Sequence, residues 1–133
     1  MKFHVKRVQQ VVAVTPNAIG MCEGIFQKLA AAGVDVHSFT ANSIGSKGVF
    51  MLQCSDCDKA ARALDKSRFD VSVEDVLLVV AKSRLGVAAQ ITKRLGIAEV
   101  DIEYMYASSH DDQEDSAIVI KCRDNDAAVE ALN

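Results

Sequence analysis

The amino-acid sequence repeats itself, and this repeat restricts the fold more than any other feature of the chain. When Gly20 is aligned with Gly86, an offset of 66 residues, the flanking sequence matches without a gap from the first apolar run to the second strand. Beyond the next loop the offset becomes 68, so that CSDCDKAARAL (54–64) lies on CRDNDAAVEAL (122–132). A chain of 133 residues would ordinarily form one domain, but its length does not forbid two units of about 60 residues sharing a core, and the repeat favours two units.

Each copy has the pattern βαββα. Short runs rich in β-branched residues predict buried strands, and an apolar spacing of i, i+3, i+4 and i+7 predicts one helix face that covers the sheet. The predicted strands are 10–14, 34–41 and 49–54 in the first copy and 76–80, 100–107 and 117–122 in the second. The predicted helix face is Cys22, Ile25, Phe26 and Leu29, matched by Ala88, Ile91, Thr92 and Leu95.

The ends of the helices carry their own signals. Gly33 can end the first helix in a left-handed conformation, and the second copy has Glu99 at that position. Asp56 and Asp124 can cap the short last helix of each copy.

Each copy lacks one strand of a closed pattern, and two matched segments can supply it. Residues 68–75 join the copies, whereas nothing follows the last helix, which ends at Asn133. The offset of 66 also places Phe69 and Val71 on Phe3 and Val5. We therefore expect residues 67–74 to complete the first sheet and residues 2–8 to complete the second, an exchange that pairs open sheet edges. The expected units are 9–74, and 75–133 with its last strand from residues 2–8.

Composition excludes several classes of protein. Half of the residues are apolar and a quarter are charged, which is typical of a globular chain. A formal net charge of -3 gives no broad basic field for nucleic acid. No apolar run reaches the roughly 20 residues that span a bilayer, and the first residues do not resemble a signal peptide. We expect a cytoplasmic protein with four reduced cysteines and no membrane partner.

The ordered repeat resembles the ACT domain family, and most closely the paired ACT units in the regulatory part of aspartokinases. The family's Asp-x-Pro-Gly loop between first strand and first helix is replaced by Asn17-Ala18-Ile19-Gly20 and Ser83-Arg84-Leu85-Gly86, which keep only the glycines. The second copy also resembles the family in its Gly-Val-Ala-Ala helix start and its Val-Asp-Ile-Glu strand entry. The resemblance implies an α+β fold of two ferredoxin-like βαββαβ units, with antiparallel sheets and helices on one face.

The resemblance also implies a regulatory module that senses an amino acid, dimerises and has no catalytic site or cofactor. No kinase portion is present in the sequence, so the regulated metabolic enzyme is expected on another chain. Glycine before a helix leaves the first-turn N–H groups accessible to a carboxylate. Gly20 and Met21 are expected to donate such groups, Asn17 to bind the amino group, and Arg84 to pair with a carboxylate. The candidate ligand residues are Asn17, Ala18, Ile19, Gly20, Met21, Asn42, Ser83, Arg84, Leu85 and Gly86.

Other interpretations remain open at this point. The glycines can be turn residues only, with decayed ligand loops, which favours a ligand-free assembly subunit. Cys54-Ser-Asp-Cys57 can be redox-active or half of a zinc site, but a second pair is missing, so strand-end packing is the simpler interpretation and no metal is expected. Tyr104 and Tyr106 share a strand face, which is either an interface or packed under a helix.

Catalysis has little support in the sequence. His4, His37 and His110 lie on separate segments without a nucleophile pattern beside them. The acidic run from His110 to Asp115 lacks the ligand spacing of a calcium loop and is typical of a solvated hairpin. We therefore expect a protein that is not an enzyme.

Overall fold

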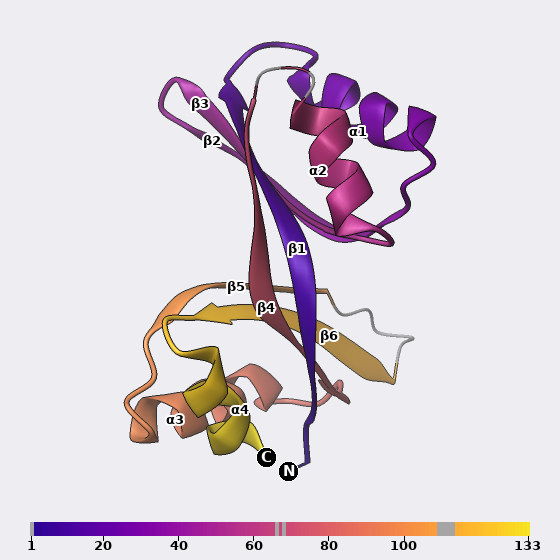
Figure 1. Ribbon diagram of the computed structural model, residues 1–133. Helices are drawn as coiled ribbons and strands as arrows, with labels where there is room; N and C mark the ends of the chain where they lie inside the picture. Colours follow the sequence, from indigo (N-terminus) through magenta and orange to yellow (C-terminus); the bar gives the residue numbers. More distant parts are fainter. Residues whose placement is uncertain (1, 66, 68, 109–113) are drawn as a thin grey trace. The chain divides into compact units, whose positions relative to one another are not determined.

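The computed structural model describes residues 2–65, 67, 69–108 and 114–133 (Figure 1). The chain divides into two compact units. The first unit is Gln9–Glu74, and the second unit is Asp75–Asn133 together with the N-terminal residues up to Val8. Each unit therefore contains a stretch of chain that comes from the other half of the sequence.

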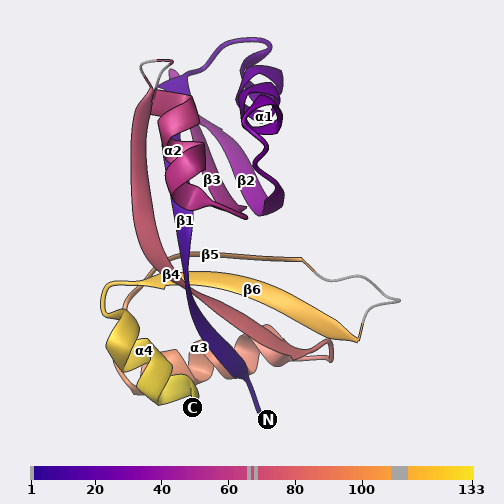
Figure 2. The same ribbon diagram turned by 45° about the vertical axis from the view of Figure 1, so that its right-hand side comes forward.

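The first unit is a four-stranded sheet with two helices. Its strands lie in the order β2-β3-β1-β4, and β3 pairs antiparallel with both β1 and β2. Helices α1 and α2 lie on the same face of this sheet, as Figures 1 and 2 show. The elements are β1 (His4–Pro16), α1 (Met21–Ala31), β2 (Val36–Ile44), β3 (Lys47–Cys54), α2 (Cys57–Asp65) and the first half of β4 (Asp70–Lys82).

The second unit repeats this arrangement with the second half of β4 and the first half of β1. Its strands lie in the order β1-β4-β6-β5, and β6 pairs antiparallel with both β4 and β5. The registers match across the repeat, since Val11 faces Leu52 in one unit and Leu77 faces Ile120 in the other. The remaining elements are α3 (Val87–Ile97), β5 (Ile102–Ser108), β6 (Asp115–Cys122) and α4 (Asn125–Leu132). The predicted α+β architecture of two ferredoxin-like units is confirmed.

β1 and β4 are longer than the sequence suggested. Each is one continuous strand of 13 residues, whereas the sequence predicted a separate strand on either side of Gln9 and Asp75. No glycine or proline interrupts either segment, so an extended backbone continues through both. Each residue of β1 is buried, half-buried or exposed in the same way as the residue at the matching position of β4.

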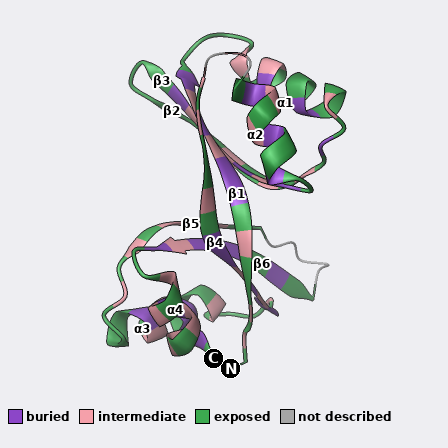
Figure 3. Ribbon diagram, viewed as in Figure 1, coloured by how far each residue is buried: buried purple, intermediate pink, exposed green. Residues whose placement is uncertain are grey.

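Each unit has its own apolar core between sheet and helices (Figure 3). In the first unit Phe69 and Val71 pack against a core built on Val11, Leu52 and Leu64. In the second unit the N-terminal Phe3 and Val5 pack against the core in the same way. Arg94 of α3 adds two contacts, because its guanidinium Cζ lies 4.6 Å from the Phe3 ring centroid and its Nη1 donates to the Leu132 carbonyl at 3.3 Å.

The buried face of α1, like that of α3, begins one residue earlier than predicted. Cys22 and Ala88 are exposed, whereas Met21 and Val87 pack against the two cores. Each helix starts directly after a left-handed glycine, which places residues 21, 25 and 29, and 87, 91 and 95, on the buried stripe. Thr92 is only half-buried and its hydroxyl donates to the Ala88 carbonyl at 2.8 Å.

The predicted helix ends are confirmed. Gly33 is left-handed with φ 75°, and Glu99 takes the same conformation in the second unit with φ 56°. Asp56 accepts from the Lys59 N–H at 3.0 Å, and Asp124 accepts from the Ala127 N–H at 3.1 Å. Among the described residues, no helix is both long and apolar enough to cross a bilayer.

Candidate functional site

The loop after β1 is fastened to the β2–β3 hairpin. The Asn17 N–H donates to the Ser46 carbonyl at 2.9 Å, and the Ser43 hydroxyl donates to Asn17 Oδ1 at 3.0 Å. Asn42, from the same hairpin, is exposed and its Nδ2 lies 3.5 Å from the Thr40 hydroxyl. The structure thus brings the predicted residues 17–21 next to the hairpin that carries Asn42. We call residues 16–22 and 42–48 the first loop region.

The start of α1 offers fewer donors than the sequence suggested. Gly20 precedes the helix with φ 85° and no side-chain cap. The Met21 N–H donates to the Ala18 carbonyl at 3.2 Å, so the predicted donor is engaged inside the turn. The first bond of helical type runs from the Gly24 N–H to the Gly20 carbonyl, at 2.9 Å. The N–H groups of Cys22 and Glu23 precede this bond in the first turn, where the helix itself provides no acceptor for them.

The loop after β4 has the same backbone and different side chains. The Ser83 N–H donates to the Glu114 carbonyl at 2.7 Å, which repeats the bond between Asn17 and Ser46. Gly86 has φ 85°, and the Val87 N–H donates to the Arg84 carbonyl at 3.2 Å. Arg84 is exposed. We call residues 82–88 and 114–116 the second loop region.

A buried hydroxyl lies under each loop, but it comes from a different strand in each unit. Thr15 of β1 is 2% exposed and faces Gly48, where a Cβ would lie 2.8 Å from the Thr15 hydroxyl oxygen. In the second unit Ala81 faces Ser116, which is 4% exposed and lies 2.6 Å, oxygen to oxygen, from the Ser83 hydroxyl. Each loop is therefore tied to its hairpin by a side chain as well as by the backbone, but the second loop uses the buried Ser116 of β6 and the first uses the exposed Ser43 of β2.

The tips of both loops are apolar. Ile19 and Leu85 occupy matched positions, and both side chains are fully exposed. Ile44, at the end of β2, is also largely exposed. Single exposed aliphatic residues are common on protein surfaces, so the distinctive feature here is that they recur at the same point of the two units.

The cysteine pair is unsuited to redox or metal chemistry. Burial is the main cause that raises the pKa of the Cys54 thiol to about 12, with smaller contributions from Cys57 and Asp35. Cys57 donates to the Gln9 carbonyl at 3.3 Å. Burial also raises the pKa of the Cys122 thiol, the match of Cys54. Within the described ranges no group of three or more metal-ligating side chains gathers.

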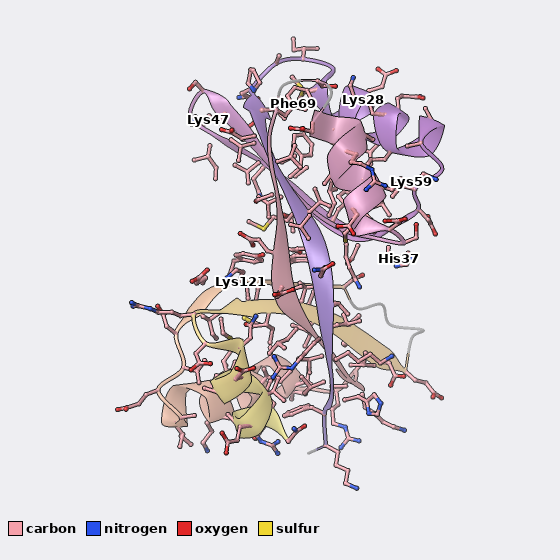
Figure 4. All side chains as sticks on the ribbon, viewed as in Figure 1. Lys28, His37, Lys47, Lys59, Phe69 and Lys121 are labelled. Carbon is pink, nitrogen blue, oxygen red and sulfur yellow. The ribbon has the colours of Figure 1, made fainter. Side chains whose placement is uncertain are left out.

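The remaining polar candidates do not come together. His4 is exposed on β1, and His37 is exposed on β2 with its Nε2 3.7 Å from Asp35 (Figure 4). His110 and the acidic residues up to position 113 lie outside the described residues. Met105 packs against the second core, so the neighbouring Tyr104 and Tyr106 lie on the sheet face away from the helices and not under α3.

Sequence reasoning missed the hairpin side of both loop regions. Ser43, Ser46 and Ser116 hold the loops, yet none of them belongs to the loop motif itself. The change of offset from 66 to 68 between the strands was the available signal, because it aligns Ser46 with Glu114 and Gly48 with Ser116.

Comparisons with known proteins identify the family. The chain matches the ACT domain pair family over residues 6–132, whereas comparison with curated proteins gives no match. A solved protein of Bacteroides thetaiotaomicron is similar with a TM-score of 0.87 and 24% identity, over 96% of this chain and 88% of that one. The ligand-free regulatory subunit of aspartate kinase from Thermus thermophilus gives 0.74 and 18%, over 99% and 95%. The aspartate kinase of Clostridium acetobutylicum gives 0.60 and 17%, over 98% of this chain and 33% of that one. The fold and the family match over nearly the whole length agree, and the chain belongs to the ACT domain family as a pair of ACT units.

Proposed function

We propose that this ACT pair is a regulatory module that binds an amino acid at its loop regions and acts on an enzyme carried by another chain. The observation that supports it is the duplicated loop, in which a left-handed glycine precedes a helix in both units. The two first-turn N–H groups at Cys22 and Glu23 suit a carboxylate. The likeness to an aspartate kinase regulatory subunit agrees with this role.

Regulation in this proposal works by a shift in population. An effector that binds one arrangement of the loops more tightly than another favours that arrangement, and only this difference in affinity reaches a partner. The proposed site residues are those of the first loop, with Asn17 and Asn42 beside the helix start, and those of the second, with Ser83 and Arg84. Cytoplasmic location and dimerisation belong to the same proposal.

Calorimetric titration of the protein with the twenty amino acids tests this proposal. We expect at least one of them to bind and to raise the unfolding temperature, as mass action requires of a ligand that binds only the folded state. Gly20→Val forces a β-branched residue to φ 85° and should abolish or strongly weaken binding at the first loop. Gly96→Ala, on an exposed position of α3, is the matched control and should leave binding unchanged. Absence of binding by any amino acid would contradict the proposal.

A second candidate function is a ligand-free assembly subunit. The exposed Ile19 and Leu85 favour it, as does the engagement of the Met21 N–H inside the turn. Under this alternative, Ile19→Ser with Leu85→Ser should dissociate an oligomer in sedimentation experiments, while no amino acid binds the original chain. Binding of an effector without a change in oligomeric state would favour the first proposal.

A further inference from the structure

The exchange of strand halves leaves each unit with a short open sheet edge. In the second unit residues 4–8 of β1 form an outermost strand, because β1 pairs with β3 only at residues 11–16. In the first unit residues 70–74 of β4 have the same place, because β4 pairs with β6 only at residues 77–82. Within the described residues, no strand covers the outer side of 4–8 or of 70–73. An outermost strand offers its backbone N–H and C=O groups to an incoming strand.

The two open edges carry opposite charge, although they are matched copies of one segment. Residues 2–8 hold three cations and no carboxylate, whereas residues 68–75 hold three carboxylates and one cation. Arg7 pairs with Asp126 at 2.6 Å, which leaves Lys2 and Lys6 as the cations of their edge. We call residues 4–8 the basic edge and residues 70–74 the acidic edge.

The charged side chains of both edges lie on the sheet face away from the helices. The apolar residues of each edge pack against the core of their unit, which fixes the direction of the others. Because side chains alternate along a strand, Lys6 points away from the helices in the second unit, and Asp70 and Ser72 do so in the first. All three are exposed.

The spacing of the charges is complementary between the two edges. If the edges lie side by side with their centres aligned, Lys6 faces Ser72 whether the strands run parallel or antiparallel. The carboxylates of Asp70 and Glu74 then take the two diagonal positions, which a long side chain reaches. On the other face Val73, an exposed aliphatic residue of the acidic edge, gains an apolar cover.

We propose that the basic edge of one copy of this chain pairs with the acidic edge of a second copy. Backbone hydrogen bonds between the two strands provide the attraction, and the charges select the partner edge, because like charges directly opposite each other are unfavourable. Each copy carries one edge of each kind, so two copies can satisfy both edges reciprocally. This inference rests on the dimerisation that belongs to the proposed function, and it names the surface that forms the dimer.

Reversing the charge of one edge at a time tests the pairing. Sedimentation velocity of the full chain should show association that increases with concentration and weakens with salt. Lys2→Glu with Lys6→Glu makes both edges acidic, and Asp70→Lys with Ser72→Lys makes both edges basic. Each double variant should associate about tenfold more weakly than the original chain, or not at all. An equal mixture of the two should associate again, because each then meets an edge of opposite charge.

A matched control separates the edges from total charge. Lys28→Glu with Lys93→Glu makes the same change in charge on exposed positions of α1 and α3, and it should leave association unchanged. Thermal unfolding of each variant checks that it folds, which is expected because all substituted side chains are exposed.

The outcomes separate this inference from the regulatory role. A monomer at every concentration, unchanged association in either edge variant, or a mixture that fails to associate would each overturn the pairing. Association that only Ile19→Ser with Leu85→Ser abolishes would assign the contact to the loop tips instead. Calorimetry of the edge variants with an amino acid that binds the original chain should give unchanged binding, so the regulatory role stands or falls independently.

Discussion

The four cysteines differ in the environment of their sulfur atoms. Cys22 is exposed beside the first loop, whereas Cys54, Cys57 and Cys122 are buried. Burial and the neighbouring Cys57 and Asp35 raise the pKa of Cys54 from 9.0 to about 12. A thiol reacts as the thiolate, so the folded chain keeps this sulfur unreactive at neutral pH.

We predict that one thiol of the folded protein reacts rapidly with a disulfide reagent at pH 8, and that the others react on unfolding. Because the folded pKa of Cys54 is raised, its stabilising effect is complete below pH 9 and is lost as the pH rises towards 12. The urea midpoint should therefore be lower at pH 10 than at pH 8. Rapid modification of Cys54 in the folded chain, identified by mass spectrometry, would show that its burial is wrong.

The matched positions Gly33 and Glu99 give an internal comparison of one backbone conformation. Both have positive φ after a helix, and only glycine adopts it without strain. Glu99→Gly should stabilise the protein by about 0.5 to 1 kcal/mol, and Gly33→Ala should destabilise it by about 1 kcal/mol. Denaturant unfolding measures both. Glu99→Ala removes the charge and keeps the strain, so it should change stability little; an equal gain from this variant would assign the effect to charge.

At the scale of the elements, the contribution of the N-terminal half of β1 to the second unit can be measured. Phe3 is half-buried, packs against the second core and lies under the Arg94 guanidinium. Phe3→Ala should cost roughly 2 to 3 kcal/mol, less than a fully buried phenylalanine, and its loss includes the cation–π contact. His4→Ala changes the exposed neighbour and should cost close to nothing. Similar urea midpoints for both variants would mean that this strand is not docked in solution.

The salt bridge between β1 and α4 contributes little to the stability of the second unit. Arg7 of β1 lies 2.6 Å from Asp126 of α4, but both side chains are mostly exposed. Exposed pairs of this kind contribute about 0 to 1 kcal/mol. Docking of the strand therefore depends on Phe3 and Val5 more than on charge.

Much of the fold could be predicted from the sequence because the helices and strands follow from local patterns that occur twice. The offsets, the β-branched runs and the caps at Asp56 and Asp124 predicted the elements and their order. The helix face was one residue off because Met21 and Cys22 are both compatible with an apolar stripe, and only the left-handed Gly20 fixes where the helix begins.

Only the loop residues of the candidate site could be predicted from the sequence, and most of the hairpin residues that hold the loops could not. The hydrogen bonds from Ser43 and to Ser46 depend on the hairpin register, which composition does not reveal. The engagement of the Met21 N–H by Ala18 depends on the turn geometry in the same way. Long-range pairing sets these contacts, so they required the structure.

At the scale of the whole molecule, shared strands should couple the stability of the two units. β1 and β4 each contribute to both sheets, so unfolding of one unit removes a strand from the other. Both tyrosines, Tyr104 and Tyr106, lie in the second unit, and the chain has no tryptophan. Tyrosine fluorescence therefore reports the second unit alone, while circular dichroism reports both.

We predict that Leu52→Ala, a core change in the first unit, shifts the tyrosine transition as far as the dichroism transition. Leu52 is fully buried, and such a truncation costs about 2 to 5 kcal/mol. Leu77→Ala at the second core should give the same coincidence of the two signals. A tyrosine midpoint left unmoved by Leu52→Ala, with a biphasic dichroism curve, would show that the units unfold independently.

The matched burial along β1 and β4 has a consequence for the ancestry of the chain. A shorter ancestor with one βαββα copy and its leading strand would have left one sheet edge unfilled, and a second identical molecule could have filled it by mutual exchange. Gene duplication would then have joined two subunits into one polypeptide. After such a fusion the halves need no longer be identical, so Pro16 and Lys82, or Lys47 and Asp115, were free to diverge under separate selection.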